Sequence, residues 1–95
     1  MATSTPWGLS QHTRKIAPGI TSYITAGHGG IKLSPTRRAS MPKVLREKPT
    51  FAGGDWYEED CDVALVIAAF PEYFPSVPKA EVVRYLKDWH GIDWS

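Results

Sequence analysis

A densely charged segment, Gly53-Gly54-Asp55-Trp56-Tyr57-Glu58-Glu59-Asp60-Cys61-Asp62, leads directly into the longest hydrophobic run of the chain, Val63-Ala64-Leu65-Val66-Ile67-Ala68-Ala69-Phe70. Asp55 and Glu58 have the spacing of a capping box, in which two side chains accept hydrogen bonds from backbone N–H groups at the start of a helix. The pattern predicts one central helix over residues 56–70, acidic at its start and buried at its end. Three β-branched residues in 63–70 leave a buried strand as the alternative, but the alanines and the length favour a helix, which Pro71 ends.

Upstream of this helix, the sequence predicts a small sheet. Pro18-Gly19 is a typical turn dipeptide, and it separates two β-prone runs at residues 14–17 and 20–26. The glycines of Gly27-His28-Gly29-Gly30 interrupt the second run, and residues 31–33 supply a third short strand. We therefore expect a three-stranded antiparallel meander.

The remaining elements follow from local signals. Ser34-Pro35 predicts a short helix at 35–40, and 43–50 is expected to be a half-ordered connector. Pro78 opens a second main helix whose buried face would carry Val82, Leu86 and Trp89. Gly91 is expected to end that helix in a left-handed conformation, with Ile92 as its hydrophobic contact.

Together these elements give an α+β fold, with a small three-stranded antiparallel meander followed by two main helices around one core. We expect a single domain over residues 1–95, in which residues 1–11 form an extended N-terminal arm and Trp7 anchors that arm to the body. No run reaches the ~18 apolar residues of a membrane span, so no membrane contact is expected. A single cysteine and the lack of a secretory signal indicate the cytoplasm.

Charge is distributed unevenly along the chain. Residues 1–50 carry a net charge of +7 and residues 51–95 a net charge of −6. Either the two halves neutralise each other within the fold, or each meets a partner of opposite sign. The basic residues are scattered and the isoelectric point is only about 7.9, which argues against direct nucleic-acid binding and leaves it as a second alternative.

No residue pattern indicates catalysis, a metal or a cofactor. Cys61 has the carboxylates Glu59, Asp60 and Asp62 as sequence neighbours, and these disfavour a reactive thiolate, so Cys61 is interpreted as a core residue. The three histidines are irregularly spaced, without the pairs that hold zinc. The acids do not match a calcium-binding EF-hand loop either.

Two surfaces are the candidates for binding. On a helix the acids would surround much of the axis, so they are either solvated and paired internally, or they form an acidic knob that docks on a basic partner. The predicted partner-binding residues are Trp56, Tyr57, Glu58, Glu59, Asp60 and Asp62. The alternative is an anion site in the glycine-rich turn, formed by Gly27, His28, Gly29, Gly30, Lys32, Arg37 and Arg38. An ordinary turn with positive-φ glycines and a locally hydrogen-bonded histidine explains that sequence better.

Several motifs carry a resemblance: Thr5-Pro6-Trp7-Gly8, Thr25-Ala26-Gly27-His28-Gly29-Gly30-Ile31-Lys32-Leu33-Ser34, Trp56-Tyr57-Glu58-Glu59-Asp60-Cys61 and Phe70-Pro71. Over nearly its whole length the chain resembles an uncharacterised bacterial and phage domain family. Such domains occur in phages, plasmids and conjugative elements, often near antirestriction genes. The resemblance implies an accessory, counter-defence role and supplies no catalytic residue.

The expected function is therefore that of a small non-enzymatic interaction protein of a phage or mobile element. It would act as a counter-defence inhibitor of the anti-CRISPR or antirestriction type, binding a host protein or ribonucleoprotein complex through its acidic surface. One alternative is a small anion-binding or ligand-binding protein, or an enzyme, centred on His28. The other is nucleic-acid binding by the basic N-terminal half. The sequence fixes neither the partner nor the oligomeric state.

Overall fold

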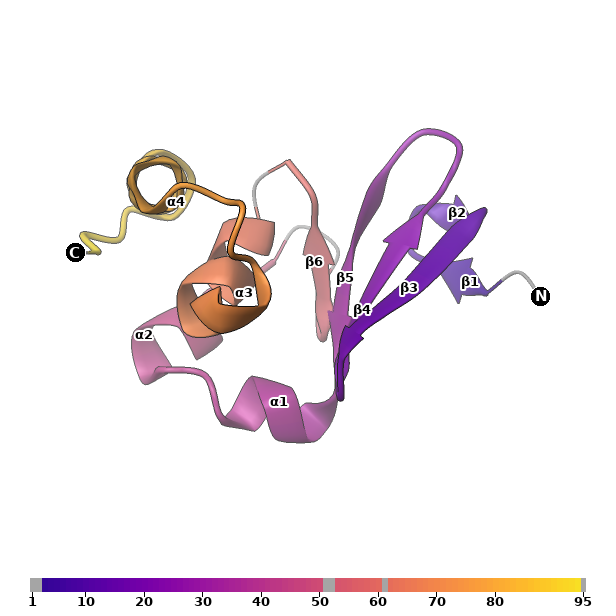
Figure 1. Ribbon diagram of the computed structural model, residues 1–95, viewed down its shortest axis with the longest axis horizontal. Coiled ribbons are helices and arrows are strands. Elements are labelled where there is room, and N and C mark those ends of the chain that lie inside the picture. Colours follow the sequence, from indigo (N-terminus) through magenta and orange to yellow (C-terminus); the bar gives the residue numbers. More distant parts are fainter. Residues whose placement is uncertain (1–2, 51–52, 61, 95) are drawn as a thin grey trace.

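The computed structural model describes residues 3–50, 53–60 and 62–94. Its main feature is a four-stranded antiparallel sheet with the strand order β3-β4-β5-β6 (Figure 1). The strands are β3 (His12–Ala17), β4 (Ile20–Ile24), β5 (Gly29–Leu33) and β6 (Trp56–Glu58). A separate two-stranded sheet, β1 (Ser4–Thr5) with β2 (Gly8–Leu9), forms a small hairpin at the N-terminal end.

The helices lie on one side of the main sheet, and the β1–β2 hairpin lies on the other (Figure 1). They are α1 (Pro35–Ala39), α2 (Lys43–Arg46), α3 (Val63–Ala69) and α4 (Lys79–His90), with a 3₁₀ turn η1 (Pro71–Tyr73) after α3. The core fills the space between sheet and helices. Its fully buried side chains come from both layers: Ile20, Leu33 and Tyr57 from the sheet, and Leu45, Leu65, Val66 and Leu86 from the helical side.

The predicted arrangement of a three-stranded meander with two main helices is wrong. The structure is α+β, but it has a two-stranded and a four-stranded sheet and, in the described part of the chain, four α-helices. The expected connector at 43–50 contains α2, which contributes the fully buried Leu45. The predicted arm is also more ordered than expected, because residues 4–9 pair with each other in β1 and β2.

The largest error concerns residues 56–58, which are strand β6 and not the start of a helix. Trp56, Tyr57 and Glu58 pair with Lys32, Ile31 and Gly30 of β5. A third strand at 31–33 would have left its outer edge unpaired, and β6 satisfies the N–H and C=O groups of that edge. Asp55 therefore does not cap a helix; its carboxylate lies 3.5 Å from Nη1 of Arg38. The helix begins only at Val63.

Elements with strong local signals are confirmed. The β3–β4 hairpin turns at Pro18-Gly19, where Gly19 has a φ of +79°, a conformation that other residues rarely adopt. At α1, the side chain of Ser34 accepts a hydrogen bond of 3.2 Å from the backbone N–H of Arg37. At the end of α4, Gly91 is left-handed with a φ of +62°, and the next residue is buried.

The buried face of α4 differs from the prediction at one position. Val82 and Leu86 face the core as expected, but Trp89 is 61% exposed. His90 is turned inward instead, with Nε2 3.7 Å from Oδ1 of Asp62. This pair joins the C-terminal end of α4 to Asp62, the residue that precedes α3. The last turn of α4 therefore contacts the rest of the protein through His90 and not through Trp89.

Tyr57 connects the sheet to the helical layer. It is 1% exposed, and its hydroxyl donates to Sδ of Met41 at 3.6 Å. Burial raises the pKa of the Tyr57 hydroxyl above its usual range, and the positive charge of Arg38 opposes part of that shift.

This raised pKa predicts a loss of stability at alkaline pH. The folded state holds the Tyr57 proton more tightly than the unfolded state, whose tyrosines ionise near pH 10. The contribution is therefore fully present below about pH 10 and is lost as the pH rises through the higher pKa of the folded protein. We expect urea unfolding at pH 9–11.5 to show a steeper decline for the wild type than for Tyr57→Phe. Parallel declines would contradict the prediction.

Candidate functional site

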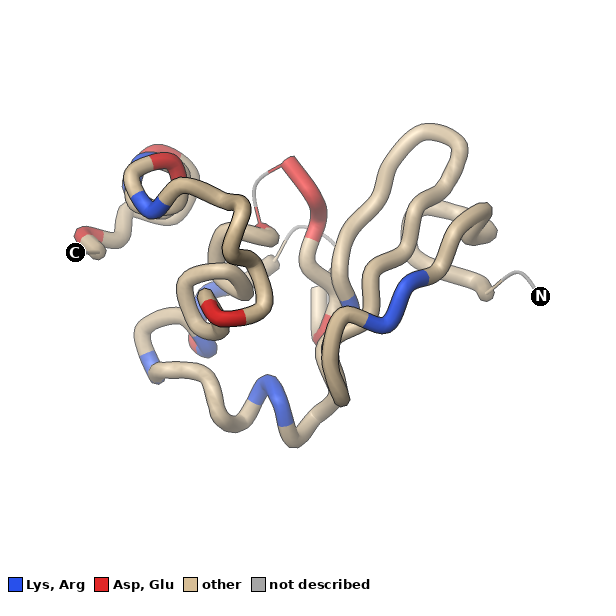
Figure 2. Tube along the Cα trace, viewed as in Figure 1, with Lys and Arg blue, Asp and Glu red and all other residues tan. Residues whose placement is uncertain are grey.

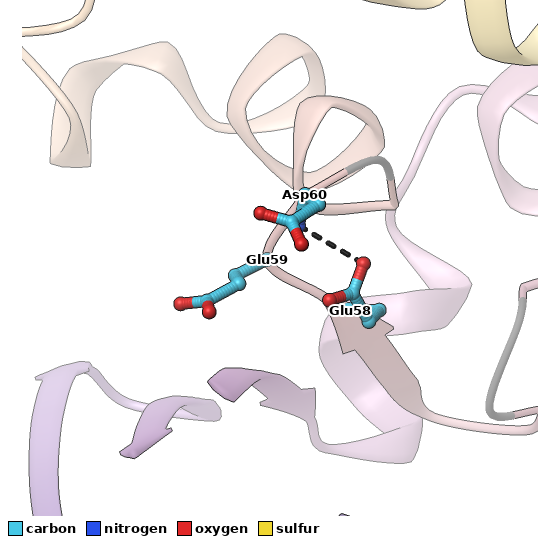
Figure 3. A group of neighbouring side chains, drawn as sticks. All are labelled: Glu58, Glu59 and Asp60. Atoms are coloured by element: carbon cyan, nitrogen blue, oxygen red, sulfur yellow. Dashed lines mark hydrogen bonds between the residues drawn. The ribbon is translucent and has the colours of Figure 1, made fainter. Parts of the chain in front are cut away.

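The acidic turn after β6 is the most concentrated group of charged side chains in the described structure. Glu58 ends β6, and Glu59 and Asp60 follow it (Figure 2). One carboxylate oxygen from each of the three residues lies within 4.8 Å of the others. The backbone N–H of Asp60 donates to Oε2 of Glu58 at 3.0 Å, which closes the turn (Figure 3).

This turn is held against the glycine-rich segment that the sequence offered as a separate site. The backbone N–H of Glu59 donates to the carbonyl oxygen of Gly29 at 3.0 Å. His28 places Nδ1 3.9 Å from Oε1 of Glu58. The antiparallel register of β5 and β6 causes this, because Gly30 lies directly opposite Glu58. Two segments far apart in the sequence therefore form one surface.

Burial divides the six predicted partner-binding residues. Glu59 and Asp60 are exposed and Trp56 is half-buried, whereas Tyr57, Glu58 and Asp62 are buried. The acids do not surround a helix, because residues 56–58 form strand β6, Glu59 and Asp60 form the turn after it, and the helix begins only at Val63. Strand alternation directs the side chain of Tyr57 into the core. In the described structure, Glu59 and Asp60 are the members of this set whose charges face solvent. Cys61, interpreted from the sequence as a core residue, lies outside the described residues.

The residues of the predicted anion site are dispersed. Lys32 lies over the ring of Trp56, with Nζ 5.2 Å from the ring centroid. Arg37 stacks on Phe70 and Tyr73 on the helical side, and Arg38 pairs with Asp55. These three cations therefore do not gather at the glycine-rich turn.

The turn itself is closed by its own contacts. The N–H of His28 donates to Oγ1 of Thr25 at 3.1 Å, and that hydroxyl donates to the carbonyl of His28 at 2.8 Å. The expectation of positive-φ glycines at 27–30 is wrong, because none of these glycines has a positive φ. Gly29 and Gly30 instead belong to β5, where they permit close approach. A side chain at Gly30 would meet the carbonyl oxygen of Tyr57 and the ring of Trp7.

The chemistry available at the acidic turn is that of oxygen ligands. Three adjacent carboxylates are the donor type that Ca²⁺ and Mg²⁺ prefer, and Glu58, Glu59 and Asp60 are the described residues that could hold such an ion. Glu58 is already engaged, because Asp60 donates to one of its oxygens and His28 faces the other. The exposed pair Glu59 and Asp60 is thus the part of the turn with charge directed outward.

A groove between α3 and α4 begins at this exposed pair, and it was not predicted from the sequence. Apolar side chains form most of its lining, and it encloses about 240 Å³. Three carboxylate residues also line it: Glu59 and Asp60 from the turn and Glu81 from α4. A second hollow of about 340 Å³ shares Ile67, Val77 and Val82 with the first and continues it towards Phe74 and Trp94. The result is an apolar groove with an acidic end.

Sequence reasoning missed this groove because its two walls are separate helices. The apolar residues Val63 and Ile67 were visible only as part of a buried run, and Glu81 only as a residue near a helix start. The predicted single helix over 56–70 also placed the acids and the apolar run on one helix. A groove needs two walls, so a single helix could not predict it.

The comparisons with known proteins give one match. A family model described as "Domain of unknown function (DUF7007)" matches residues 1–95. Neither the curated proteins nor the solved structures include a significant match to the chain. Among the described residues, no helix is long and apolar enough to cross a membrane.

Proposed function

We propose that this chain, which belongs to the DUF7007 family of domains, is a non-enzymatic interaction module that binds a basic, amphipathic segment of a partner protein in the groove between α3 and α4. The observation that supports the proposal is the composition of the groove. Its apolar lining, which includes Val63, Ile67 and Val77, adjoins the carboxylates of Glu59, Asp60 and Glu81.

The shape of the groove favours a peptide segment. The part beside the carboxylates encloses about 240 Å³, and the adjoining hollow encloses about 340 Å³. The adjoining hollow extends it along the two helices, as expected for a surface that receives successive side chains of a partner helix. Leucine-like side chains would fill the apolar part, and lysine or arginine would pair with the acidic end.

The acidic end would contribute mainly to the rate and specificity of binding. Glu59, Asp60 and Glu81 are all exposed, so each ion pair formed there is partly screened by solvent. Exposed charges of one sign accelerate the encounter with a partner of opposite sign and disfavour acidic competitors. The apolar groove would supply most of the affinity.

The biological setting is part of the same proposal and rests on the resemblance. The chain would derive from a phage or another mobile element and act in the bacterial cytoplasm against a host defence complex. Restriction enzymes and CRISPR ribonucleoproteins bind phosphate backbones, so they carry Lys-rich and Arg-rich segments. A module that covers such a segment would inhibit the complex without any catalytic step.

Charge reversal in the groove tests the proposal. The probe is a synthetic amphipathic helical peptide with Leu on one face and Lys and Arg on the other. We expect the triple variant Glu59→Lys, Asp60→Lys and Glu81→Lys to bind it at least ten-fold more weakly at low salt, measured by fluorescence anisotropy. All three side chains are exposed, so the melting temperature should change little.

The matched control reverses three exposed acids outside the groove: Glu47→Lys, Asp88→Lys and Asp93→Lys. It changes the net charge by the same amount, and we expect it to retain most of the affinity. Equal losses in the two triple variants would indicate a nonspecific charge effect and reject the groove. Unchanged binding of the groove variant would reject the acidic end as a determinant.

A further inference from the structure

The face of the main sheet that points away from the helices is a second, chemically different surface. Strand alternation places Ile20, Ile31 and Tyr57 in the core and their sequence neighbours on this outer face. The strand register aligns three of those neighbours, together with Lys15 of β3, in one row across all four strands. The row runs Lys15, Thr21, Lys32, Trp56, each paired with the next.

The row is short and positively charged. Neighbouring strands are about 4.8 Å apart, so the row spans about 14 Å. Lys15 and Lys32 are both exposed, and no member of the row is acidic. The exposed acids Glu59 and Asp60 follow the far end of β6, outside the row. Asp55, which precedes Trp56, is paired with Arg38.

Aromatic rings gather at the β6 end of the row. Trp56 meets Trp7 edge-on at 5.6 Å between ring centroids, and Tyr23 at 5.3 Å. Gly30 makes this possible, since its missing side chain leaves room for Trp7 above β5. The three rings are half-buried, so their positions are fixed while part of each remains accessible.

We propose that this outer face binds single-stranded nucleic acid, with phosphates at Lys15 and Lys32 and an unpaired base stacked on Tyr23, which contacts Trp56; the ring of Trp56 itself is covered by Lys32. Stacking platforms next to a cationic track are the usual way in which proteins bind single strands without reading their sequence. The hydroxyl of Thr21, between the two lysines, can donate to the same backbone. A duplex keeps its bases inside the helix and cannot use the aromatic cluster.

This proposal differs in surface and in partner from the groove between α3 and α4. The sequence argued against nucleic-acid binding because the basic residues are scattered along the chain. The fold gathers two of them, Lys15 and Lys32, which are far apart in the sequence, beside an aromatic cluster. Arg37 and Arg38, which the sequence placed in the predicted anion site, take no part, because Arg37 stacks on Phe70 and Tyr73 and Arg38 pairs with Asp55.

The test measures binding of a fluorescein-labelled twelve-nucleotide oligo-dT by anisotropy at 20–300 mM salt. Two phosphate contacts to a single strand predict a slope of about −1.4 in a plot of log K against log salt. We expect Lys15→Ala with Lys32→Ala to weaken binding at least ten-fold at low salt and to bring the slope close to zero. The control Lys43→Ala with Lys87→Ala removes two exposed helical lysines and should bind like the wild type.

A second variant tests the aromatic cluster without relying on the lysines. Tyr23→Thr keeps a residue that favours strands and should weaken oligo-dT binding about five-fold or more, from the usual value of a base–aromatic stack. Its melting temperature is measured in parallel, so that a folding defect is recognised. Trp89→Phe, on the exposed side of α4, is the control for a distant aromatic residue.

The competitors decide between partners. An unlabelled oligo-dT should displace the probe, and a twelve-base-pair duplex or a poly-glutamate peptide should displace it at least ten-fold less well. Equal displacement by poly-glutamate would assign the face to acidic peptides and overturn the proposal. No binding at 20 mM salt, or equal losses in the two lysine pairs, would also overturn it.

Discussion

Replacing Gly30 with alanine is expected to lower the free energy of unfolding by about 1–3 kcal/mol, the usual cost of adding atoms to a well-packed site. The new Cβ would meet the carbonyl oxygen of Tyr57 in β6 and the ring of Trp7. The Trp7 side chain can move, but the Tyr57 carbonyl belongs to the backbone of the paired strand. The substitution therefore forces β5 and β6 apart and also displaces the N-terminal hairpin from the sheet.

Urea denaturation measures the loss of stability, and near-ultraviolet circular dichroism reports the Trp7–Trp56 contact. Gly27→Ala is the matched control, because a Cβ at Gly27 meets no atom within 4 Å and its φ is not positive. We expect Gly27→Ala to stay within about 0.5 kcal/mol of the wild type, as surface substitutions usually do. Equal stabilities of the two variants would show that the close packing at Gly30 does not exist.

Replacing Tyr57 with alanine is expected to cost about 3–5 kcal/mol, the range for removing a large aromatic side chain from a core. Tyr57 is 1% exposed, pairs with Ile31 of β5 within the sheet and reaches Met41 with its hydroxyl. A domain of this size has roughly 5–15 kcal/mol of total stability, so the variant would be close to unfolding at 37 °C. Circular dichroism during thermal melting gives the measurement.

Two further substitutions keep this prediction decisive if Tyr57→Ala does not fold. Tyr57→Phe retains the ring and loses the hydroxyl with its hydrogen bond to Met41, at a cost of about 1 kcal/mol. Tyr73→Ala removes the ring of a tyrosine that is 37% exposed and should have a small effect. A Tyr57→Ala protein as stable as the wild type would refute the core position and would leave Tyr57 available as the partner contact that the sequence predicted.

The two binding surfaces place opposite charges on different parts of the molecule. Glu59, Asp60 and Glu81 adjoin the helical groove, whereas Lys15 and Lys32 lie on the outer face of the sheet. The sequence left open whether the basic and acidic halves neutralise each other. Among the described residues, Arg38 and Asp55 form one pair between the two halves. Lys15 and Lys32 of the basic half and Glu59, Asp60 and Glu81 of the acidic half are exposed, so these charges can meet a partner.

Local signals accounted for the parts of the fold that were predicted correctly. A turn at Pro18-Gly19, a cap at Ser34 and a left-handed end at Gly91 each depend on residues within a few positions of one another. The same reasoning failed at Asp55 and Glu58, although their spacing matches a capping box. The pairing of β6 with β5 fixes their backbone. A short-range pattern cannot show that the outer edge of β5 needs a partner strand.

In the candidate site, too, single residues could be identified from the sequence, but their neighbours in space could not. His28 and the acids at 58–60 were each identified from the sequence, but as rival surfaces. Only the register Gly30 opposite Glu58 brings them together. The groove and the outer face were not predicted at all, because the groove needs two separate helices and the outer face needs four strands in a defined order.

By itself, the sequence determined that the chain forms a small α+β fold, where the turn at Pro18-Gly19, the cap at Ser34 and the helix end at Gly91 lie, and that the run 63–70 contributes to the core. The tertiary structure decided which side of each strand is buried, which acids remain exposed, and which distant residues become neighbours. The physical reason is that caps and turns are satisfied by nearby backbone groups. The burial of Tyr57 and the alignment of Lys15 with Lys32 depend instead on strand pairing and on the layer of helices that covers one face of the sheet.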